Sequence, residues 1–237
     1  DEFAAGINWT DPWTDGEWRM RYVYRESKSQ YASETITTNS RVLTNNASGS
    51  YQSASIEYAK ELPVSGLAHT DGAMLSGSLT WADRNVSADS YFYDEDDLED
   101  HIYYAGQSYT KAGFNVVTGN LDIPLKAELA LSGSFLEERL KLGVAAKYNF
   151  AYDGVAYTDE NVTIGGIQHE IWQDKAFDGM LTVDVSGSYK VATVDDHGVT
   201  LNFKVINLFN EIGNATSSKT TPWVIGRTFW VGASAEF

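Results

Sequence analysis

Cysteine is absent from the 237-residue sequence, so neither disulfides nor thiolate chemistry are available. Basic residues are scarce, with 17 Lys and Arg against 33 Asp and Glu, and the net charge of −16 argues against nucleic acid as a partner. Proline occurs only four times. No run approaches the roughly 18 apolar residues of a transmembrane helix, although barrel strands that alternate in polarity also lack such a run.

Catalytic motifs are also lacking. The sequence contains no G-x-S-x-G, no H-E-x-x-H and no phosphate-binding glycine motif. No pair of carboxylates stands at a spacing that indicates acid–base chemistry. We therefore expect no enzyme activity, no cofactor and no metal site. The sequence does not begin with Met and shows no signal peptide, which favours a processed or excised piece.

The most informative segment is the last one, residues 199–237. Two alternating stretches, VTLNFKVINLFN and VIGRTFWVGASAEF, flank a polar loop. Apolar residues of the second stretch fall on one face: Phe229, Val231, Ala233, Ala235 and Phe237. An alternating strand that ends on an aromatic residue is typical of a membrane β-barrel.

Period-two alternation recurs along the whole chain and predicts about nine strands. They lie near residues 5–9, 18–25, 53–58, 73–81, 125–135, 140–152, 181–191, 199–210 and 224–237. The predicted connections alternate between short ones (11–16, 62–72, 136–139 and 192–198) and long ones (33–49, 84–121, 153–171 and 211–222). This alternation is typical of periplasmic turns and extracellular loops. We predict an all-β fold, an antiparallel transmembrane β-barrel segment formed by one domain over residues 1–237.

The odd strand count has a consequence. If the last strand ends at the periplasmic side, nine strands place residue 1 outside, whereas bacterial single-chain barrels have even strand numbers and both termini in the periplasm. We therefore expect the chain to complete a barrel begun by a separate chain. A further wall strand within 84–121 would give ten strands, an even number, and a separate chain would then no longer be needed. Two alternatives stay open: a self-contained small barrel (porin, adhesin or barrel enzyme), and a soluble secreted β-sandwich, whose strands alternate too.

Three segments resemble the last three strands of TonB-dependent outer-membrane receptors: 177–191, 199–210 and 226–237. Asn207-Leu208-Phe209 resembles the segment that ends the penultimate strand of that family, and Gly226-Arg227-Thr228-Phe229 the one that opens the last strand. Phe237 resembles the terminal aromatic residue that the barrel-assembly machinery reads.

The resemblance implies a barrel of about 22 strands around an N-terminal plug, in the outer membrane of a Gram-negative bacterium. Such receptors import a scarce nutrient of the siderophore, haem, cobalamin or glycan type, with energy passed on by TonB. The 237 residues include no plug and no TonB-interacting segment, and would supply the last part of the wall and its extracellular loops. The implied partners are a plug-bearing N-terminal barrel half as a separate chain, TonB through that half, outer-membrane lipid, and a small-molecule or glycan substrate.

An acidic run, 94–100, lies in the longest predicted loop between aromatic residues. Clustered carboxylates suit Ca²⁺ or a cationic substrate and aromatic rings suit stacking, although the run lacks the glycine and spacing of an EF-hand loop. The candidate substrate-binding residues here are Tyr93, Asp94, Asp96, Asp97, Tyr103 and Tyr104. The simpler interpretation is a solvated loop.

Arg19, Arg21 and Arg25 alternate along one strand and would form a cationic stripe in the lumen. Such a stripe could attract anionic substrates, although ion pairs with a plug or a neighbouring strand are the simpler interpretation. The four histidines (His69, His101, His169 and His197) are expected in turns or loops. His101 near Tyr103 and Tyr104 could supply a haem ligand, but an ordinary exposed histidine is the simpler reading.

Overall fold

The computed structural model describes residues 2–37, 40–86, 101–110, 113–114, 123–194, 197–213 and 225–236. Within these residues the chain forms two sheets. The strands are β1 (Glu2–Thr10), β2 (Glu17–Thr37), β3 (Ser40–Leu62), β4 (Thr70–Val86), β5 (His101–Tyr104), β6 (Gln107–Thr110), β7 (Leu125–Phe135), β8 (Leu140–Asn149), β9 (Tyr152–Ile164), β10 (Ile167–Phe177), β11 (Met180–Val194), β12 (His197–Ile206) and β13 (Thr228–Glu236). Among the described residues there is no helix that is long and apolar enough to cross a membrane.

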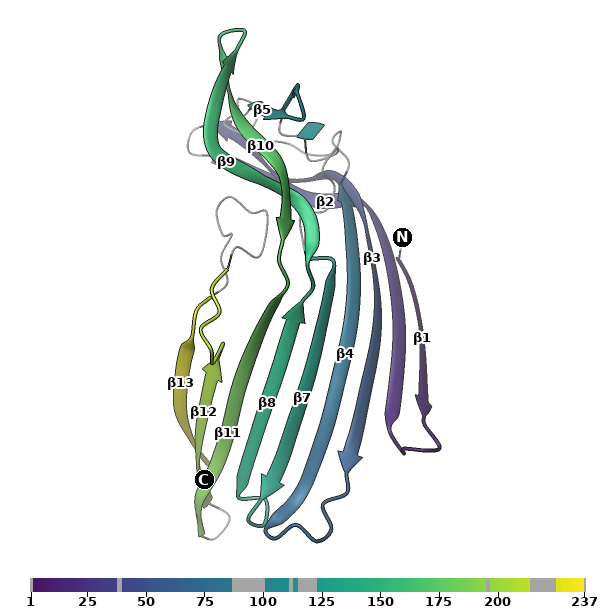
Figure 1. Cartoon of the computed structure of the whole chain (residues 1–237), viewed down its shortest axis with the longest axis vertical. Coiled ribbons are helices and arrows are strands. Elements are labelled where there is room, and N and C mark those ends of the chain that lie inside the picture. Colours follow the sequence, from purple (N-terminus) through teal and green to yellow (C-terminus); the bar gives the residue numbers. More distant parts are fainter. Residues whose placement is uncertain are drawn as a thin grey trace.

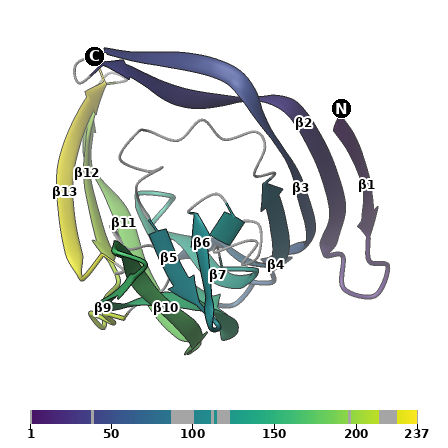
Figure 2. The same ribbon diagram turned by 90° about the horizontal axis from the view of Figure 1, so that it is seen from above.

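The larger sheet, which we call the wall, has nine antiparallel strands in the order β1-β2-β3-β4-β7-β8-β11-β12-β13. In Figure 1 these strands stand side by side along the long axis. Seen from above, they form an arc with β1 at one end and β13 at the other (Figure 2). The predicted fold class and the count of nine wall strands are confirmed.

The smaller sheet, which we call the cap, has the order β6-β5-β10-β9. Its strands β9 and β10 form a hairpin between wall strands β8 and β11, and β5 pairs in parallel with β10. Figure 1 places the cap beyond one end of the wall, which we call the loop end; the opposite end is the turn end. Of the residues that the structure describes within 84–121, those of β5 and β6 join the cap and leave the wall count at nine.

One face of the wall is apolar across all nine strands. The register sets Met20 of β2 between Ile7 of β1 and Ile56 of β3, and Val144 of β8 between Leu131 of β7 and Val185 of β11. Many of these side chains are exposed, including Leu131 at 44% and Leu129 at 58%. Most of the buried apolar side chains among the described residues belong to the cap instead. A soluble sandwich would bury this face against a second sheet.

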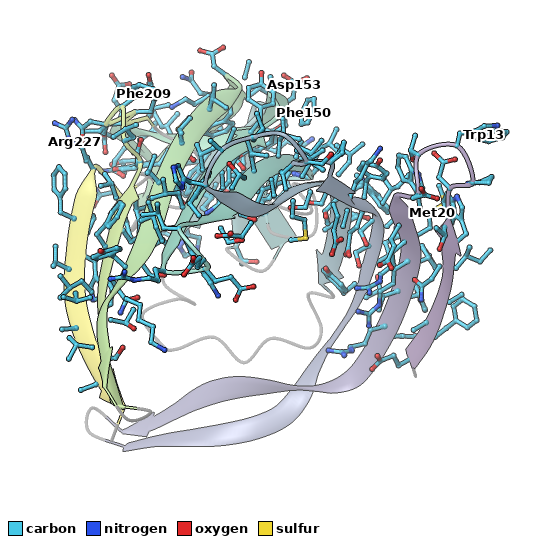
Figure 3. All side chains as sticks on the ribbon, turned by 90° about the horizontal axis from the view of Figure 1, so that it is seen from below. Trp13, Met20, Phe150, Asp153, Phe209 and Arg227 are labelled. Carbon is cyan, nitrogen blue, oxygen red and sulfur yellow. The ribbon has the colours of Figure 1, made fainter. Side chains whose placement is uncertain are left out.

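The opposite face of the wall is polar. One row of register partners runs Arg19, Glu57, Ser78, Glu128 and Lys147 across β2, β3, β4, β7 and β8. In Figure 3 nitrogen- and oxygen-tipped side chains of the wall point into the hollow of the arc. The sheet therefore presents an apolar outside and a polar inside, the pattern of a transmembrane barrel.

At the turn end, β1 and β2 are joined by a tight turn. The Asp11 carboxylate accepts a hydrogen bond from the Trp13 amide (3.0 Å) and another from the Thr14 hydroxyl (2.6 Å). A Cβ at Gly16 would lie 2.3 Å from the Tyr58 ring, so any other residue there would force the ring to move. Trp18 stacks on Trp9 and also contacts Tyr58, which places an aromatic cluster where interfacial girdles occur.

Two predicted long loops are strands instead. Residues 33–37 and 40–49 continue β2 and β3, which reach 21 and 23 residues, and residues 153–171 form most of the β9–β10 hairpin. A strand of this length spans roughly 70 Å, whereas the hydrocarbon core of a bilayer is about 30 Å thick. No proline lies between residues 13 and 62 to remove a backbone donor, and the β2–β3 pairing continues past register shifts near Ser27, Gln30 and Thr35. The hairpins therefore extend beyond the membrane as paired strands.

Substitution of an outward residue should be far more costly than substitution of its inward neighbour. We expect Leu131→Arg to lower the unfolding free energy of the lipid-embedded barrel by about 2–4 kcal/mol, because it places a charge in hydrocarbon. Ser132→Arg, one residue along β7 on the polar face, is the matched control and should cost less than about 1 kcal/mol. Urea unfolding in phospholipid vesicles measures both, and equal costs would contradict the assignment of the faces.

Candidate functional site at the loop end of the wall

The cap has its own small core. Ile102 of β5, Val155 of β9 and Trp172 of β10 pack with Phe114, and each is at most 9% exposed. Tyr104, Tyr109 and Tyr157 pack against this cluster. Apolar burial therefore holds the β5–β6 segment against the β9–β10 hairpin, which lies about 40 residues further along the sequence. The parallel pairing of β5 with β10 joins the same two segments.

Three of the four histidines lie in strands, His101 and His169 in the cap and His197 at the start of β12, so the expectation that all four fall in turns or loops is wrong for these three and confirmed for His69. His169 is only 3% exposed. Its Nδ1 lies 3.0 Å from the Ile167 carbonyl oxygen, which can only accept, so Nδ1 carries a proton. Its Nε2 lies 2.5 Å from the Ser108 hydroxyl, and both ring nitrogens are therefore satisfied. The His101 ring packs edge-on against it. These two hydrogen bonds indicate that His169 has a structural role in the cap.

Tyr104 and Tyr103, two candidate substrate-binding residues, have different surroundings. The Tyr104 hydroxyl donates a 2.5 Å hydrogen bond to the Asp174 carboxylate, and its ring packs on Phe114. This bond raises the pKa of Tyr104 above its usual value. Tyr104 is thereby held within the cap. Tyr103 alternates with it along β5 and is half-buried on the other face. Tyr93, Asp94, Asp96 and Asp97, together with Phe237, lie outside the described residues.

The arginine stripe is placed on the polar face. Arg25 contacts Glu2 at 3.0 Å, and Arg19 contacts Glu57 at 3.5 Å. Both pairs join neighbouring strands and are well exposed, so each stabilises the sheet little. Arg21 forms no ion pair within the described part of the chain. Arg19 and Glu57 also line a hollow of about 540 Å³ on the polar face.

Asn207 organises the loop end of β12. Its backbone is left-handed, with a φ of 52°, and its side chain is almost fully buried. The side-chain amide donates to the carbonyl oxygens of Glu211 (2.7 Å) and Ile225 (3.1 Å), and its oxygen accepts from the Glu211 amide (2.9 Å). Asn207 therefore ties together the two ends of the connection between β12 and β13.

Arg227 secures the same connection from the other side. Its backbone amide donates to the Asn210 side-chain oxygen at 2.8 Å, and its guanidinium donates to the Leu208 carbonyl oxygen at 3.3 Å. The guanidinium also lies over the Phe229 ring. Figure 3 shows Arg227 and Phe209 close together at the β12–β13 end of the arc. The two segments that carry the family resemblance, 207–209 and 226–229, therefore interlock, and we call this set of contacts the clamp.

The clamp is joined to the polar face by Asp184 of β11. One Asp184 carboxylate oxygen accepts from the Asn207 backbone amide at 2.9 Å, and the other lies 2.7 Å from the Lys147 ammonium. The Asp184 side chain is 9% exposed, whereas that of Lys147 is 45% exposed. Removing Lys147 therefore leaves the buried Asp184 charge with the Asn207 amide as its hydrogen-bond partner, which costs free energy.

A cavity of about 390 Å³ lies beside the clamp. One wall is the segment 211–213, and the others come from the ends of β8, β10 and β11. Polar lining residues are Asn149, Lys175, Asp178 and Glu211, and aromatic ones are Phe150, Tyr152 and Phe177. The volume is in the range of small-molecule sites. Among the described residues, no three His, Cys, Asp or Glu side chains gather as they would around a metal ion.

Sequence reasoning missed Asp184, Lys147 and the cavity. Asp184 and Lys147 occupy ordinary polar positions of alternating strands, and nothing in either strand marks them as partners. The β9–β10 hairpin did have a signal: Gly165-Gly166 between Ile164 and Ile167 is a two-residue turn sequence, and both glycines have positive φ.

Two solved structures share this fold over nearly the whole chain. The outer membrane transporter YddB from Escherichia coli superposes with a TM-score of 0.64 at 16% identity, over 98% of this chain and 32% of its own. The FrpB iron transporter from Neisseria meningitidis (F3-3 variant) superposes with a TM-score of 0.54 at 14% identity, over 98% of this chain and 30% of its own. No family model and no curated protein sequence matches the chain.

These likenesses show the fold. The chain spans about a third of the length of both transporters, and its nine-stranded wall superposes on part of their structures. The resemblance to the barrel portion of a TonB-dependent receptor is confirmed as a likeness of fold.

Asn207 and Asn210 offer a matched pair of tests, because both have left-handed backbones that glycine adopts freely. Asn207→Gly removes three side-chain hydrogen bonds and should lower the unfolding free energy by roughly 2–3 kcal/mol. Asn210→Gly removes one exposed bond and should cost about 1 kcal/mol or less. Urea unfolding in vesicles compares the two variants. Equal losses would show that backbone conformation, not the buried side chain, determines the effect.

The bond between Tyr104 and Asp174 should give the cap an alkaline limit. Because the folded pKa of Tyr104 is raised, the stabilisation is complete below the unfolded value of about 10 and is lost as pH rises through the folded value. Absorbance titration of the wild type minus Tyr104→Phe should isolate one tyrosine with a pKa above the ordinary range. In Asp174→Asn this pKa should return toward the ordinary value, and a wild-type midpoint at or below that value would contradict the assignment.

Proposed function

We propose that the chain forms part of the wall of a TonB-dependent transport barrel in the outer membrane of a Gram-negative bacterium. The observation that carries the proposal is the wall itself, which is apolar on its convex face, polar on its concave face and extended at one end by long paired strands. The fold shared with two outer-membrane transporters supports it. In this arrangement the chain supplies wall, lumen lining and extracellular loops.

The two ends of the sheet indicate what else is needed. Within the described residues β1 pairs only with β2, and β13 pairs only with β12. Open strand edges do not occur in the hydrocarbon region, because no water is there to satisfy their backbone groups. We therefore include in the proposal a plug-bearing barrel portion whose strands pair with β1 and β13, and through which TonB acts. A closed small barrel would need β1 and β13 to pair with each other.

The proposed substrate is a scarce small molecule or glycan that binds at the loop end. The cavity beside the clamp and the cap strands are the described surfaces that such a molecule meets first. FrpB is named as an iron transporter; whether this barrel carries a siderophore, haem, cobalamin or glycan is decided by uptake measurements. The strong negative charge gives no support to a nucleic-acid partner.

The protein should fractionate with outer membranes and migrate on SDS gels as a compact form that shifts only after boiling. The unheated band should be much heavier than 237 residues alone can account for, because other strands complete the barrel. Intact mass of that band decides whether the remainder continues this polypeptide or is a second chain. Uptake of the substrate should stop when TonB is deleted. A water-soluble monomer, or a closed barrel made by these residues alone, would overturn the proposal.

A further inference from the structure

Lys147 and the clamp belong to one chain of contacts. The Lys147 ammonium is half-exposed on the polar face of the wall and contacts the Asp184 carboxylate at 2.7 Å. The second Asp184 oxygen accepts from the Asn207 amide, and the Asn207 side chain holds Glu211 and Ile225. Three links therefore lead from the lumen to the segment that forms a wall of the 390 Å³ cavity.

Asp184 is the middle residue of this chain of contacts, and few other groups hold it in place. Asp184 is 7% exposed, so water does not replace a lost partner. Its hydrogen-bond partners among the described residues are Lys147 and the Asn207 amide, and the charge of Lys204 acts on it without a hydrogen bond. If the ammonium is withdrawn, the carboxylate keeps one neutral donor and gains free energy by becoming hydrated. Opening of the Asn207 turn, whose backbone amide contacts the second carboxylate oxygen, would let water reach that oxygen.

The neighbouring contacts make this response local. Lys147 and Asp184 are diagonal neighbours, since the register pairs Lys147 with Thr182. The backbone ladder between β8 and β11 is continuous from Met180 to Tyr189 and does not depend on either side chain. The ladder between β11 and β12, in contrast, begins at Val185, and beyond it the Leu208 amide donates to the Val183 carbonyl oxygen. The turn at Asn207 is thus the weaker of the two neighbours of Asp184.

We infer that Asp184 is a positioning residue that couples the lumen to the loop-end cavity. Lys147 keeps Asp184 in place, Asp184 keeps the Asn207 turn closed, and the turn holds the cavity wall at 211–213. Removing the ammonium, by substitution or by an anionic group that binds it instead, opens the same turn. Such coupling is reciprocal. If the Lys147–Asp184 pair favours the closed 211–213 wall by some factor, a ligand that holds this wall closed favours the pair by the same factor. The inference rests on the proposed function in one respect, that the polar face lines the lumen.

Hydrogen exchange of the complete, lipid-embedded barrel tests the coupling. In Lys147→Met the amides of Asn207 and Glu211 should exchange roughly tenfold faster or more, because a buried charge loses its partner. The β8–β11 ladder should keep its protection. Lys141→Met is the matched control, since Lys141 lies on the same face of β8 opposite Ser188 and Ser134, and it should change neither region.

Three further variants separate coupling from general loss of stability. Lys147→Arg keeps the charge and should keep the protection. Asp184→Asn keeps an acceptor for the Asn207 amide but carries no charge. If Lys147 and Asp184 form one network, adding Lys147→Met to Asp184→Asn should change hydrogen exchange by less than about twofold. The double variant should also assemble if Lys147→Met alone does not.

Uniform acceleration of the β8–β11 ladder, unchanged exchange at Asn207 and Glu211, or additive effects in the double variant would each overturn the inference. The proposed function is judged separately, by the outer-membrane location and heat-dependent mobility of the wild type. A wild type that meets both criteria while the variants show no coupling contradicts the inference alone.

Discussion

The structure depends on the requirement that every backbone N–H and C=O group in a membrane have a partner. Nine antiparallel strands meet it through a ladder whose register shifts lie in the pairs β2–β3, β4–β7 and β11–β12, and where the ladder is regular, each strand can only alternate its side chains between two faces. The wall uses this alternation fully, with apolar residues outside and polar residues inside. The same requirement explains why the edges of β1 and β13 indicate further strands.

The loop end shows how the ladder is brought to a close. At Asn207 the chain turns out of β12 with a left-handed backbone, and its buried side chain supplies bonds that strand pairing no longer provides. Arg227 completes the closure from the start of β13. The cap uses a different principle, burial of aromatic and aliphatic side chains in a core of its own. The wall thus owes its order to hydrogen bonding in lipid, and the cap to apolar packing in water.

Sequence alone could predict the wall because alternation is a direct consequence of burial on one side of a sheet. It placed strands at all nine wall positions. It could not distinguish the long hairpins of β2–β3 and β9–β10 from loops, because no regular alternation of apolar and polar residues marks those segments. The clamp was visible only as a resemblance in 207–209 and 226–229. Asp184 was not visible, since its partners, the Asn207 amide and Lys147, lie 23 and 37 residues away in the sequence. The placement of Tyr104 against Asp174 likewise required the parallel pairing of β5 with β10, which no local pattern specifies.

Spin labels placed one at a time from Leu140 to Asn149 of β8, in the lipid-embedded barrel, test the central claim most directly. Accessibility to oxygen, which concentrates in hydrocarbon, and to a water-soluble nickel chelate should alternate with a period of two. Oxygen should dominate at Leu142, Val144, Ala146 and Tyr148, and the chelate at the residues between them. Uniform accessibility along β8, or maxima exchanged between the two faces, would contradict the account.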